Sequence, residues 1–218
     1  MPKLRVHCFA ISVDGYSAGP NQDPENPIGA GGLALFDWQF ATRTHRQKAG
    51  QDGGATGFDD DMVARGFERI GAWIIGRNMF GPVRGPWLDD AWKGWWGDNP
   101  PFHTQVFVLT HYPREPIVMQ GGTTFHFVTD GIAAARQRAL AAANGADVRL
   151  GGGVSTLQQY LRAGLVDELH LVLSPALIGS GERLFDNLDL PSLSYELAGY
   201  TPSAVATHVT IRKRNNDD

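Results

Sequence analysis

The sequence predicts an α/β protein with a three-layer fold: a mostly parallel, mixed central sheet that ends in a C-terminal antiparallel hairpin. Over the first three quarters of the chain, strand-like apolar runs alternate with helical segments, which favours parallel strands covered by helices. Residues 193–214 then contain two consecutive strand patterns. A length of 218 residues, 42% of them hydrophobic and 19% charged, is enough for one domain with a full core. We therefore expect a single domain over residues 1–214 and a frayed tail at 215–218.

The N-terminal part of the chain begins with a strand pattern, "LRVHCFAISVDGY", that enters a turn at Asp14–Gly15. An amphipathic patch follows at residues 33–43, and a glycine-rich loop at 47–57. A helix is expected next, with acids at its N-terminal end, where the helix dipole favours them. These acids are Asp59–Asp61, the expected buried positions of the helix are Met62, Phe67 and Ile70, and a buried strand follows at Ala72–Ile75.

The second half of the chain has a more regular pattern. Strands are expected at residues 105–111, 123–130, 146–153 and 167–179, and helices at 131–145 and 154–163. The second helix places Val154, Leu157 and Leu161 on one face, and Gly164 marks its end.

Composition excludes several classes of function. A net charge of −4 with no basic stripe argues against nucleic-acid binding. No run of about 18 apolar residues and no signal peptide is visible, so we expect no membrane contact and a cytoplasmic location. Cys8 is the only cysteine, which excludes an intramolecular disulfide, a thiolate-rich zinc site and the zinc deaminase signature. We therefore predict no metal site.

Three glycines, Gly151, Gly152 and Gly153, join a strand to a helix. Bare backbone at a helix N-terminus can hold a phosphate, because the free N–H groups and the helix dipole both face it. A tight strand-to-helix turn with close packing explains the same residues, and the glycines alone do not choose between the two explanations.

Two further strands end in residues suited to phosphate. One ends in Gly76–Arg77–Asn78 and the other in Thr110–His111. Ligands of open parallel sheets lie across the carboxyl ends of the strands, and arginine can bind a phosphate with two nitrogens. Together the three strand ends favour a phosphorylated dinucleotide, although His111 alone would be read as a surface histidine.

The ordered set "AISVDG", "IIGRNM", "VFVLTH" and "RLGGGVSTLQQYLRAGLVDELHLVLSPALIGSGERLF" resembles the dihydrofolate reductase superfamily. It is most similar to the branch that contains the reductase half of the riboflavin-biosynthesis deaminase–reductase. The resemblance implies a dihydrofolate reductase-like fold, a homodimer and NADPH bound across the sheet. It implies the reduction of a C=N or carbonyl group of a small heterocycle, by a 5-amino-6-(5-phosphoribosylamino)uracil reductase-like or dihydrofolate reductase-like enzyme.

The resemblance also assigns roles to positions. It places Thr110 and His111 at the adenosine 2′-phosphate and implies a cis peptide between two of the glycines, which we expect at Gly151–Gly152. The residues that it implies contact the cofactor are Ala10, Ile11, Gly76, Arg77, Asn78, Thr110, His111, Gly151, Gly152, Gly153, Val154, Ser155 and Thr156.

The chain departs from true dihydrofolate reductases at the position of their acidic residue. The segment "GGLALFDWQF" places Gly32 there. Asp37, five residues on, is the candidate catalytic acid, and a solvated helix position is the alternative. Folate itself is therefore doubtful as the substrate, and a pteridine- or pyrimidine-like heterocycle is expected.

Several other residues have both a structural and a functional explanation. We interpret Asp14 as a turn former, His170 as a hydrogen-bonded core histidine, and Glu182 with Arg183 as a structural ion pair. Packing or a subunit interface is favoured over a stacking lid for Trp87, Trp92, Trp95 and Trp96, and residues 50–58 are the better candidate for a moving lid.

The sequence thus predicts an NADPH-dependent reductase of a small nitrogen heterocycle. The alternative is a non-catalytic NADP(H)-binding or sensing protein of the same fold, which would share every phosphate-site residue. A flavin-binding reductase is a third possibility, but the three strand ends suit a free dinucleotide better than a flavin.

Overall fold

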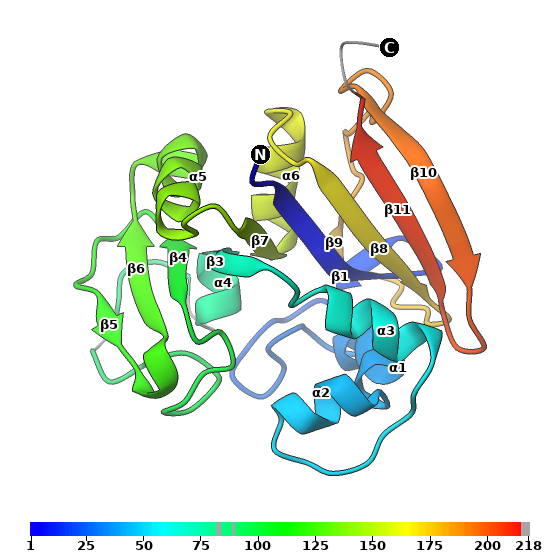
Figure 1. The fold of residues 1–218 in the computed structure, drawn as a ribbon, viewed down its shortest axis with the longest axis horizontal. Coiled ribbons are helices and arrows are strands. Elements are labelled where there is room, and N and C mark those ends of the chain that lie inside the picture. Colours follow the sequence, from blue (N-terminus) through cyan, green and yellow to red (C-terminus); the bar gives the residue numbers. More distant parts are fainter. Residues whose placement is uncertain (82–83, 89, 215–218) are drawn as a thin grey trace. The chain divides into compact units, whose positions relative to one another are not determined.

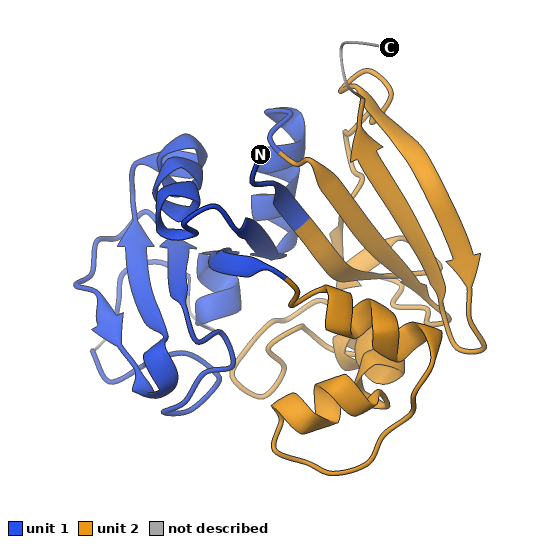
Figure 2. Ribbon diagram, in the orientation of Figure 1, with its two compact units in different colours: residues 1–5, 69–165 blue, residues 6–68, 166–218 orange. Residues whose placement is uncertain are grey.

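The computed structural model describes residues 1–81, 84–88 and 90–214, so the predicted tail at 215–218 lies outside the described residues. The chain divides into two compact units (Figure 2). Unit 1 holds residues 1–5 and 69–165, and unit 2 holds residues 6–68 and 166–218. Strand β1 (Leu4–Ser12) begins in unit 1 and continues in unit 2.

The fold class predicted from the sequence is confirmed. The described residues form a nine-stranded mixed sheet in the order β10-β11-β8-β1-β7-β3-β4-β6-β5 (Figure 1). Besides β1, its strands are β3 (Ile70–Gly76), β4 (Gln105–Leu109), β5 (Ile117–Val118), β6 (Thr124–Val128), β7 (Asp147–Gly152), β8 (Glu168–Ser174), β10 (Tyr195–Pro202) and β11 (Thr207–Lys213). A separate antiparallel pair joins β2 (Tyr16–Ala18) to β9 (Glu182–Arg183).

Unit 1 contains the parallel part of the sheet. Strands β7, β3, β4 and β6 are parallel neighbours, and the short β5 is antiparallel to β6. Helix α5 packs against β3 and β4, and α6 packs against β7 and β3. The helical segments of this unit are α4 (Arg77–Phe80), η2 (Gln120–Gly122), α5 (Gly131–Ala142) and α6 (Val154–Arg162). Strands and helices therefore alternate here as the sequence predicts.

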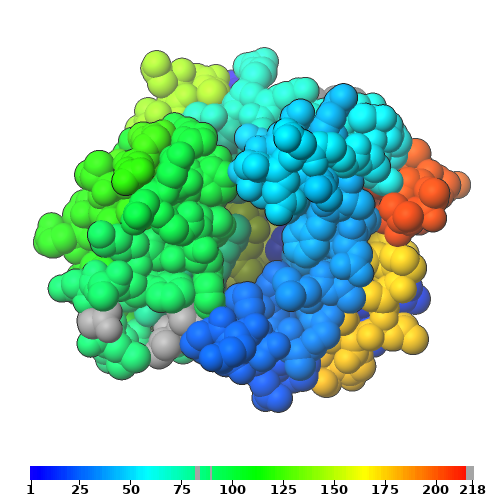
Figure 3. All heavy atoms as spheres, turned by 90° about the horizontal axis from the view of Figure 1, so that it is seen from below, coloured from blue at the N-terminus to red at the C-terminus, as the bar shows by residue number. Residues whose placement is uncertain are grey.

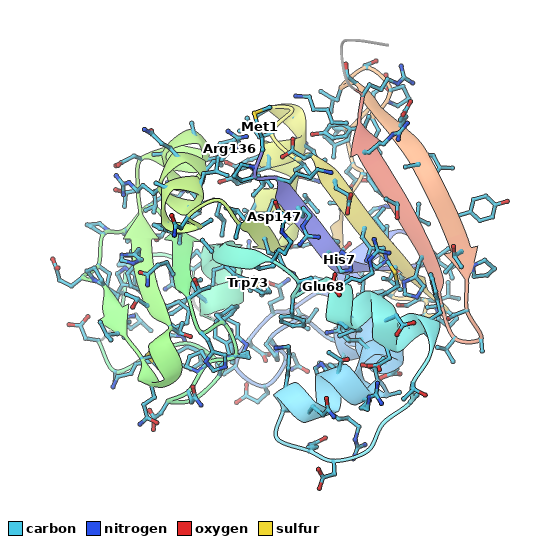
Figure 4. The ribbon with its side chains drawn as sticks, in the orientation of Figure 1. Met1, His7, Glu68, Trp73, Arg136 and Asp147 are labelled. Atoms are coloured by element: carbon cyan, nitrogen blue, oxygen red, sulfur yellow. The ribbon has the colours of Figure 1, made fainter. Side chains whose placement is uncertain are left out.

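The core of unit 1 lies between its parallel strands and one face of α6. The three apolar residues predicted for that face are buried. Asp147, labelled in Figure 4, stands at the start of β7 and holds the first residues of the chain. Its carboxylate accepts from the Lys3 amide at 2.8 Å and pairs with Arg5 at 3.1 Å. Residues that are at most 1% exposed in this core include Ile74, Ile75, Phe80, Val106, Val108, Phe125, Val128, Val148, Leu150, Leu157, Tyr160 and Leu161.

Unit 2 contains the antiparallel strands and the helices of the first third of the chain. Strand β11 lies between β8 and β10 and pairs antiparallel with both, so the predicted C-terminal hairpin is present. The helical segments are η1 (Gly32–Phe36), α1 (Asp37–Phe40), α2 (Arg43–Lys48) and α3 (Phe58–Arg65). The amphipathic patch predicted at 33–43 is not one helix: it covers most of η1, all of α1 and the first residue of α2.

Helix α3 is shorter than the sequence predicts. Its first turn carries Asp59–Asp61, and Met62 is buried, as expected. The helix ends at Arg65, however, and Ile70 opens β3 instead of lying on the helix. Arg69 has a φ of +56°, which breaks the helical geometry before the strand begins. Phe67 also lies beyond the end of the helix, and both Phe67 and Ile70 are only partly buried, so the prediction of these two residues as buried helix positions was wrong.

Residues 49–57, which connect α2 to α3, are exposed. The segment lies on the face of the molecule that Figure 3 shows. Among the described residues, none of the helices has the length and apolar character needed to cross a membrane.

Candidate cofactor site

The three strand ends that the sequence singled out lie level with one another in unit 1. In the parallel register, Gly76 at the end of β3 pairs with Leu109 at the end of β4, and Ile75 pairs with Gly152 at the end of β7. Parallel strands bring their carboxyl ends to one edge of a sheet. The arginine that follows β3, the threonine that follows β4 and the glycines of β7 therefore share one edge, as predicted.

The glycine turn is placed one residue later than expected. Strand β7 runs through Gly152, with an irregular register against β3 between Ile74 and Ile75. The structure has a cis peptide between two of the glycines, as the resemblance implies, but it lies at Gly152–Gly153. The prediction of Gly151–Gly152 was wrong because Gly152 still pairs with β3, so the chain turns only after it.

Packing explains two glycines of this edge, and a third faces open space. A Cβ atom on Gly76 would lie 2.3 Å from Thr156 Oγ1, and one on Gly151 would lie 3.0 Å from both Ile75 Cγ2 and Met79 Sδ. At Gly153 an added Cβ meets no described atom within 4 Å. Close packing therefore requires Gly76 and Gly151, whereas the absence of a side chain at Gly153 leaves bare backbone at the surface of the turn.

Helix α6 begins beside this open space with its first turn uncapped. Gly153 is the N-cap residue and supplies no side-chain hydrogen bond to the helix. In the first turn Val154 and Thr156 are buried, whereas Ser155 is exposed. The N–H groups of a first turn and the helix dipole attract anions, so the open backbone and the helix start favour the same kind of ligand.

The side chain of Arg77 places a positive charge at the same edge. Its guanidinium carbon lies 3.5 Å from the centre of the Trp87 ring, and Nε and Nη1 are buried with no hydrogen-bond partner among the described residues. Burial, and then the charge of Arg114, lower the pKa of Arg77 to about 10, so the side chain is still charged at neutral pH. Buried, unsatisfied donors on a charged group are costly, and an anionic ligand would satisfy them.

Arg114 is a second cation that the sequence reasoning missed. Its guanidinium carbon lies 4.9 Å from the centre of the same Trp87 ring, and its Nη1 is buried without a partner in the described part of the chain. Nη2 donates to the Asp90 carbonyl at 2.8 Å, so part of the group is anchored. The residue stands in an irregular segment after β4 with no motif around it. Only its contact with the tryptophan shows that it belongs beside Arg77.

The other polar residues of the edge are partly used by the protein itself. With its amide oxygen turned toward Arg84, Asn78 accepts from that residue's Nη2 and Nε at 2.8 and 3.0 Å. The Thr110 hydroxyl accepts from the Tyr112 amide at 3.1 Å, and His111 is exposed. In this structure Asn78 and Thr110 shape the segments next to Arg77, and His111 has the exposure of a surface histidine.

The remaining predicted site residues belong to unit 2. Ala10 and Ile11 are buried on β1. Asp37 is exposed and opens α1, and Gly32 is buried at the start of η1. The role of Asp37 as a catalytic acid and the contact of Ala10 and Ile11 with a cofactor stay predictions.

Asp14 has the structural role that the sequence suggests. Its carboxylate accepts from the Ser12 hydroxyl and from the amides of Ile178 and Gly179. The Ser12 hydroxyl above all lowers the pKa of Asp14 to about 2. A carboxylate with so low a pKa is a poor general base near neutral pH, so Asp14 fixes the turn after β1.

The tryptophans of residues 87–96 are half-buried and pack against other aromatic rings of unit 1. Trp87 meets the rings of Phe80 and Phe127 edge-on, and Trp96 does the same with Phe102. Trp92 donates to the Phe80 carbonyl at 2.9 Å and meets the ring of Trp95 edge-on. These contacts confirm the packing explanation, and Trp87 also forms the surface on which both arginines lie.

The model of the RibD C-terminal domain matches residues 2–209, nearly the whole chain. The chain belongs to the RibD C-terminal domain family. This membership confirms the resemblance seen in the sequence and identifies the chain as a reductase-type domain of the dihydrofolate reductase-like fold.

Solved structures agree with this RibD-type fold. A putative riboflavin biosynthesis protein from Shewanella sp. PV-4 matches with a TM-score of 0.61 and 22% identity, over 97% of this chain and 99% of that one. The Thermotoga maritima diaminohydroxyphosphoribosylaminopyrimidine deaminase/5-amino-6-(5-phosphoribosylamino)uracil reductase matches with a TM-score of 0.55 and 13% identity, over 98% of this chain and 57% of that one. A pyrimidine reductase-like protein from Corynebacterium diphtheriae gives a TM-score of 0.54 and 13% identity, with 99% and 93% covered. At these identities the likeness concerns the fold. No curated protein matches the sequence.

Proposed function

We propose that this protein is an NADPH-dependent reductase of a small nitrogen heterocycle, pteridine- or pyrimidine-like, and that it works as a homodimer in the cytoplasm. The observation that carries the proposal is the charged Arg77 guanidinium. Two of its nitrogens are buried without a partner in the described chain, at the sheet edge where the bare backbone of Gly153 opens α6. A ligand with phosphates at two places satisfies both features, and NADPH is such a ligand.

In this proposal, different residues of unit 1 bind different phosphates of the cofactor. Gly153 and the first turn of α6 would hold the diphosphate, because their N–H groups are uncapped and no side chain blocks the approach. Arg77, with Arg114 beside it, would hold the 2′-phosphate through charge-assisted hydrogen bonds. This assignment makes the protein select NADPH over NADH, since only NADPH carries that phosphate.

Reduced nicotinamide, when bound, supplies the hydride equivalent for the heterocycle. The contribution of the chain is then to position donor and acceptor, which accounts for a large part of such catalysis. Asp37 remains the proposed proton source, and water is the alternative because Gly32 occupies the position of the acidic residue in true dihydrofolate reductases.

The test compares Gly153→Val with Gly199→Val. An added Cβ meets no described atom within 4 Å at either position, so both variants are expected to fold. Only the Gly153 variant fills the turn beside α6, and we expect it to lose NADPH binding in calorimetric titration while the Gly199 variant binds normally. Normal NADPH affinity in a folded Gly153→Val protein would contradict the proposal.

A panel of pteridines and pyrimidines separates the reductase from its non-catalytic alternative. NADPH oxidation that depends on one of these heterocycles is the expected result. Tight NADPH binding without oxidation across the panel would favour an NADP(H) sensor. Sedimentation velocity, with an expected mass of twice the 23.7 kDa chain, tests the homodimer.

A further inference from the structure

A second group of reactive side chains lies in unit 2, separate from the residues proposed for the cofactor. His7 and Cys8 are neighbours on β1, and His170 comes from β8 (Figure 4 labels His7). One ring nitrogen of each histidine and the Cys8 sulfur lie within 4.8 Å of one another. The three residues are 7%, 6% and 1% exposed, so these groups meet in the interior of unit 2.

The hydrogen bonds of His7 determine which of its nitrogens carries a lone pair. Nε2 lies 2.7 Å from the Met62 carbonyl oxygen. A carbonyl only accepts, so Nε2 carries the proton and Nδ1 the lone pair. Histidines that bind metals almost always donate their other ring N–H to a carbonyl or carboxylate, which fixes the tautomer and the ring orientation. His7 has this arrangement.

His170 has the same arrangement, with a longer chain of hydrogen bonds behind it. Its Nδ1 accepts from the Cys8 amide at 3.1 Å, so Nε2 carries the proton and donates to His208 Nδ1 at 3.0 Å. His208 Nε2 in turn donates to Asp59 Oδ1 at 2.7 Å. The carboxylate of Asp59 thus orients His170 and its lone pair through His208. A carboxylate behind a histidine is a recurrent feature of metal centres.

The backbone at Cys8 is also unusual. Its φ is +55°, although it is a buried, non-glycine residue within a strand. Such conformations are strained and gather at functional sites. The side chain lies among apolar neighbours, including Trp38, Val63 and Val172.

We propose that His7, Cys8 and His170 form a binding site for a thiophilic d10 metal ion, Zn²⁺ or Cu⁺. Ligand atoms around a tetrahedral zinc ion are about 3.3–3.8 Å apart, given bonds of about 2.0–2.3 Å. The cluster, in which one nitrogen of each histidine and the Cys8 sulfur lie within 4.8 Å of one another, therefore has to contract to bind such an ion. The ion takes the place of the Cys8 amide on His170 Nδ1, and the thiol loses its proton to solvent on binding.

The charges of the site suit such an ion. Two neutral imidazoles and one thiolate leave a Zn²⁺ centre with one positive charge, which the carboxylate of Asp59 balances through His208. A Cu⁺ centre is neutral before that carboxylate is counted. Three protein ligands leave the fourth position of a zinc ion to a water molecule. This proposal does not depend on the proposed reductase activity, because none of its residues belongs to the phosphate-binding edge.

The experiment uses the full chain, reduced and stripped of metal, and Co²⁺ as a spectroscopic probe. We expect one equivalent of Co²⁺ to give a thiolate-to-cobalt charge-transfer band that one equivalent of Zn²⁺ abolishes. Cys8→Ser removes the band and weakens Zn²⁺ binding at least about 100-fold. His208→Gln keeps the band but weakens binding about 10- to 100-fold, because it removes only the support of a ligand. His126→Gln, at a histidine of β6 in unit 1, binds as the unaltered protein does.

Two further measurements keep the test decisive. If Cys8→Ser fails to fold, X-ray absorption on the unaltered protein with Zn²⁺ must show one sulfur ligand at about 2.3 Å. Anaerobic titration with Cu⁺ against a chromophoric chelator identifies the other occupant: stoichiometric Cu⁺ that Cys8→Ser abolishes supports the site with copper as its ion. Binding without sulfur, binding that only His126→Gln weakens, or no binding of either ion overturns the proposal.

Discussion

At the scale of single residues, Arg77 carries most of the functional argument. A guanidinium is expensive to bury without hydrogen bonds, yet two nitrogens of Arg77 lack them within the described chain. Its contact with the Trp87 ring recovers part of that cost as a cation–π interaction, and a nearby second guanidinium raises the cost again. An anionic ligand that accepts hydrogen bonds from these two nitrogens would therefore lower the free energy of the site.

Arg77→Ala should weaken NADPH more than NADH. The loss of a charged hydrogen bond to phosphate costs about 1.5–3 kcal/mol, or about 10- to 150-fold in NADPH affinity. NADH lacks the 2′-phosphate and should lose little. Fluorescence titration of both cofactors measures the ratio, and Arg138→Ala, at an exposed arginine paired with Asp130, is the control. An equal loss for both cofactors would remove the 2′-phosphate from the role of Arg77.

Asp14→Asn should destabilise the protein at neutral pH and much less in acid. The folded protein holds the pKa of Asp14 near 2, below its ordinary value of 3.8, so the unfolded chain takes up the proton first as pH falls. The stabilisation is complete above about pH 4 and disappears as pH falls through about 2. Urea denaturation at pH 7 and pH 3 measures the difference, with Asp52→Asn in the exposed loop as a control. A stability gap that is the same at both pH values would contradict this prediction.

At the scale of elements, close contacts between strands and helices explain why two positions of β3 are glycines, which could not be inferred from the sequence. A Cβ on Gly71 of β3 would lie 2.4 Å from the carbonyl oxygen of Ala143, at the end of α5. Gly76, at the other end of β3, meets the side chain of Thr156 on α6 in the same way. Both helices can lie close against β3 only because these positions lack side chains.

Gly71→Ala should therefore destabilise unit 1 by about 1–3 kcal/mol, the usual cost of overpacking. The obstacle is the backbone of Ala143, which cannot rotate away as a flexible side chain can. Urea denaturation gives the change in the free energy of unfolding. The same change at Gly199 on β10, where an added Cβ meets nothing within 4 Å, should cost far less. Equal midpoints for the two variants would show that α5 moves aside freely.

Elements were predictable to different degrees. Helix α6 begins and ends as its sequence indicates, because Gly153 precedes it, Gly164 follows with a φ of +61°, and its apolar face is regular. Helix α3 was predicted too long, because its apolar spacing continues past Arg65 while the backbone turns at Arg69. A periodic pattern records which residues can be buried on one face, but it does not record where the chain leaves the helix.

At the scale of the whole molecule, the proposed cofactor contacts that the structure supports all lie in unit 1. The glycine turn, the start of α6 and Arg77 come from residues 69–165, whereas Asp37 belongs to unit 2. The cofactor part of the proposal can therefore be tested by where a ligand protects the chain, independently of catalysis.

NADPH should raise the stability of the protein and protect unit 1 locally. A ligand at 100 times its dissociation constant adds about 2.7 kcal/mol to the free energy of unfolding when it binds only the native state. Hydrogen exchange followed by mass spectrometry should show protection at residues 76–80 and 151–157. The antiparallel strands β10 and β11 serve as the internal reference. Protection confined to those strands would place the binding site elsewhere.

The sequence by itself determined the order of strands and helices, the family and the polar residues at three strand ends. Those properties are local or repeat along the chain, so periodicity and short motifs record them. Only the tertiary structure placed Arg114 beside Arg77, assigned Gly76 and Gly151 to packing, and brought His170 to Cys8. Each of these pairs joins residues far apart in the chain, and their contact follows from strand register and the path of the backbone, which no short motif encodes.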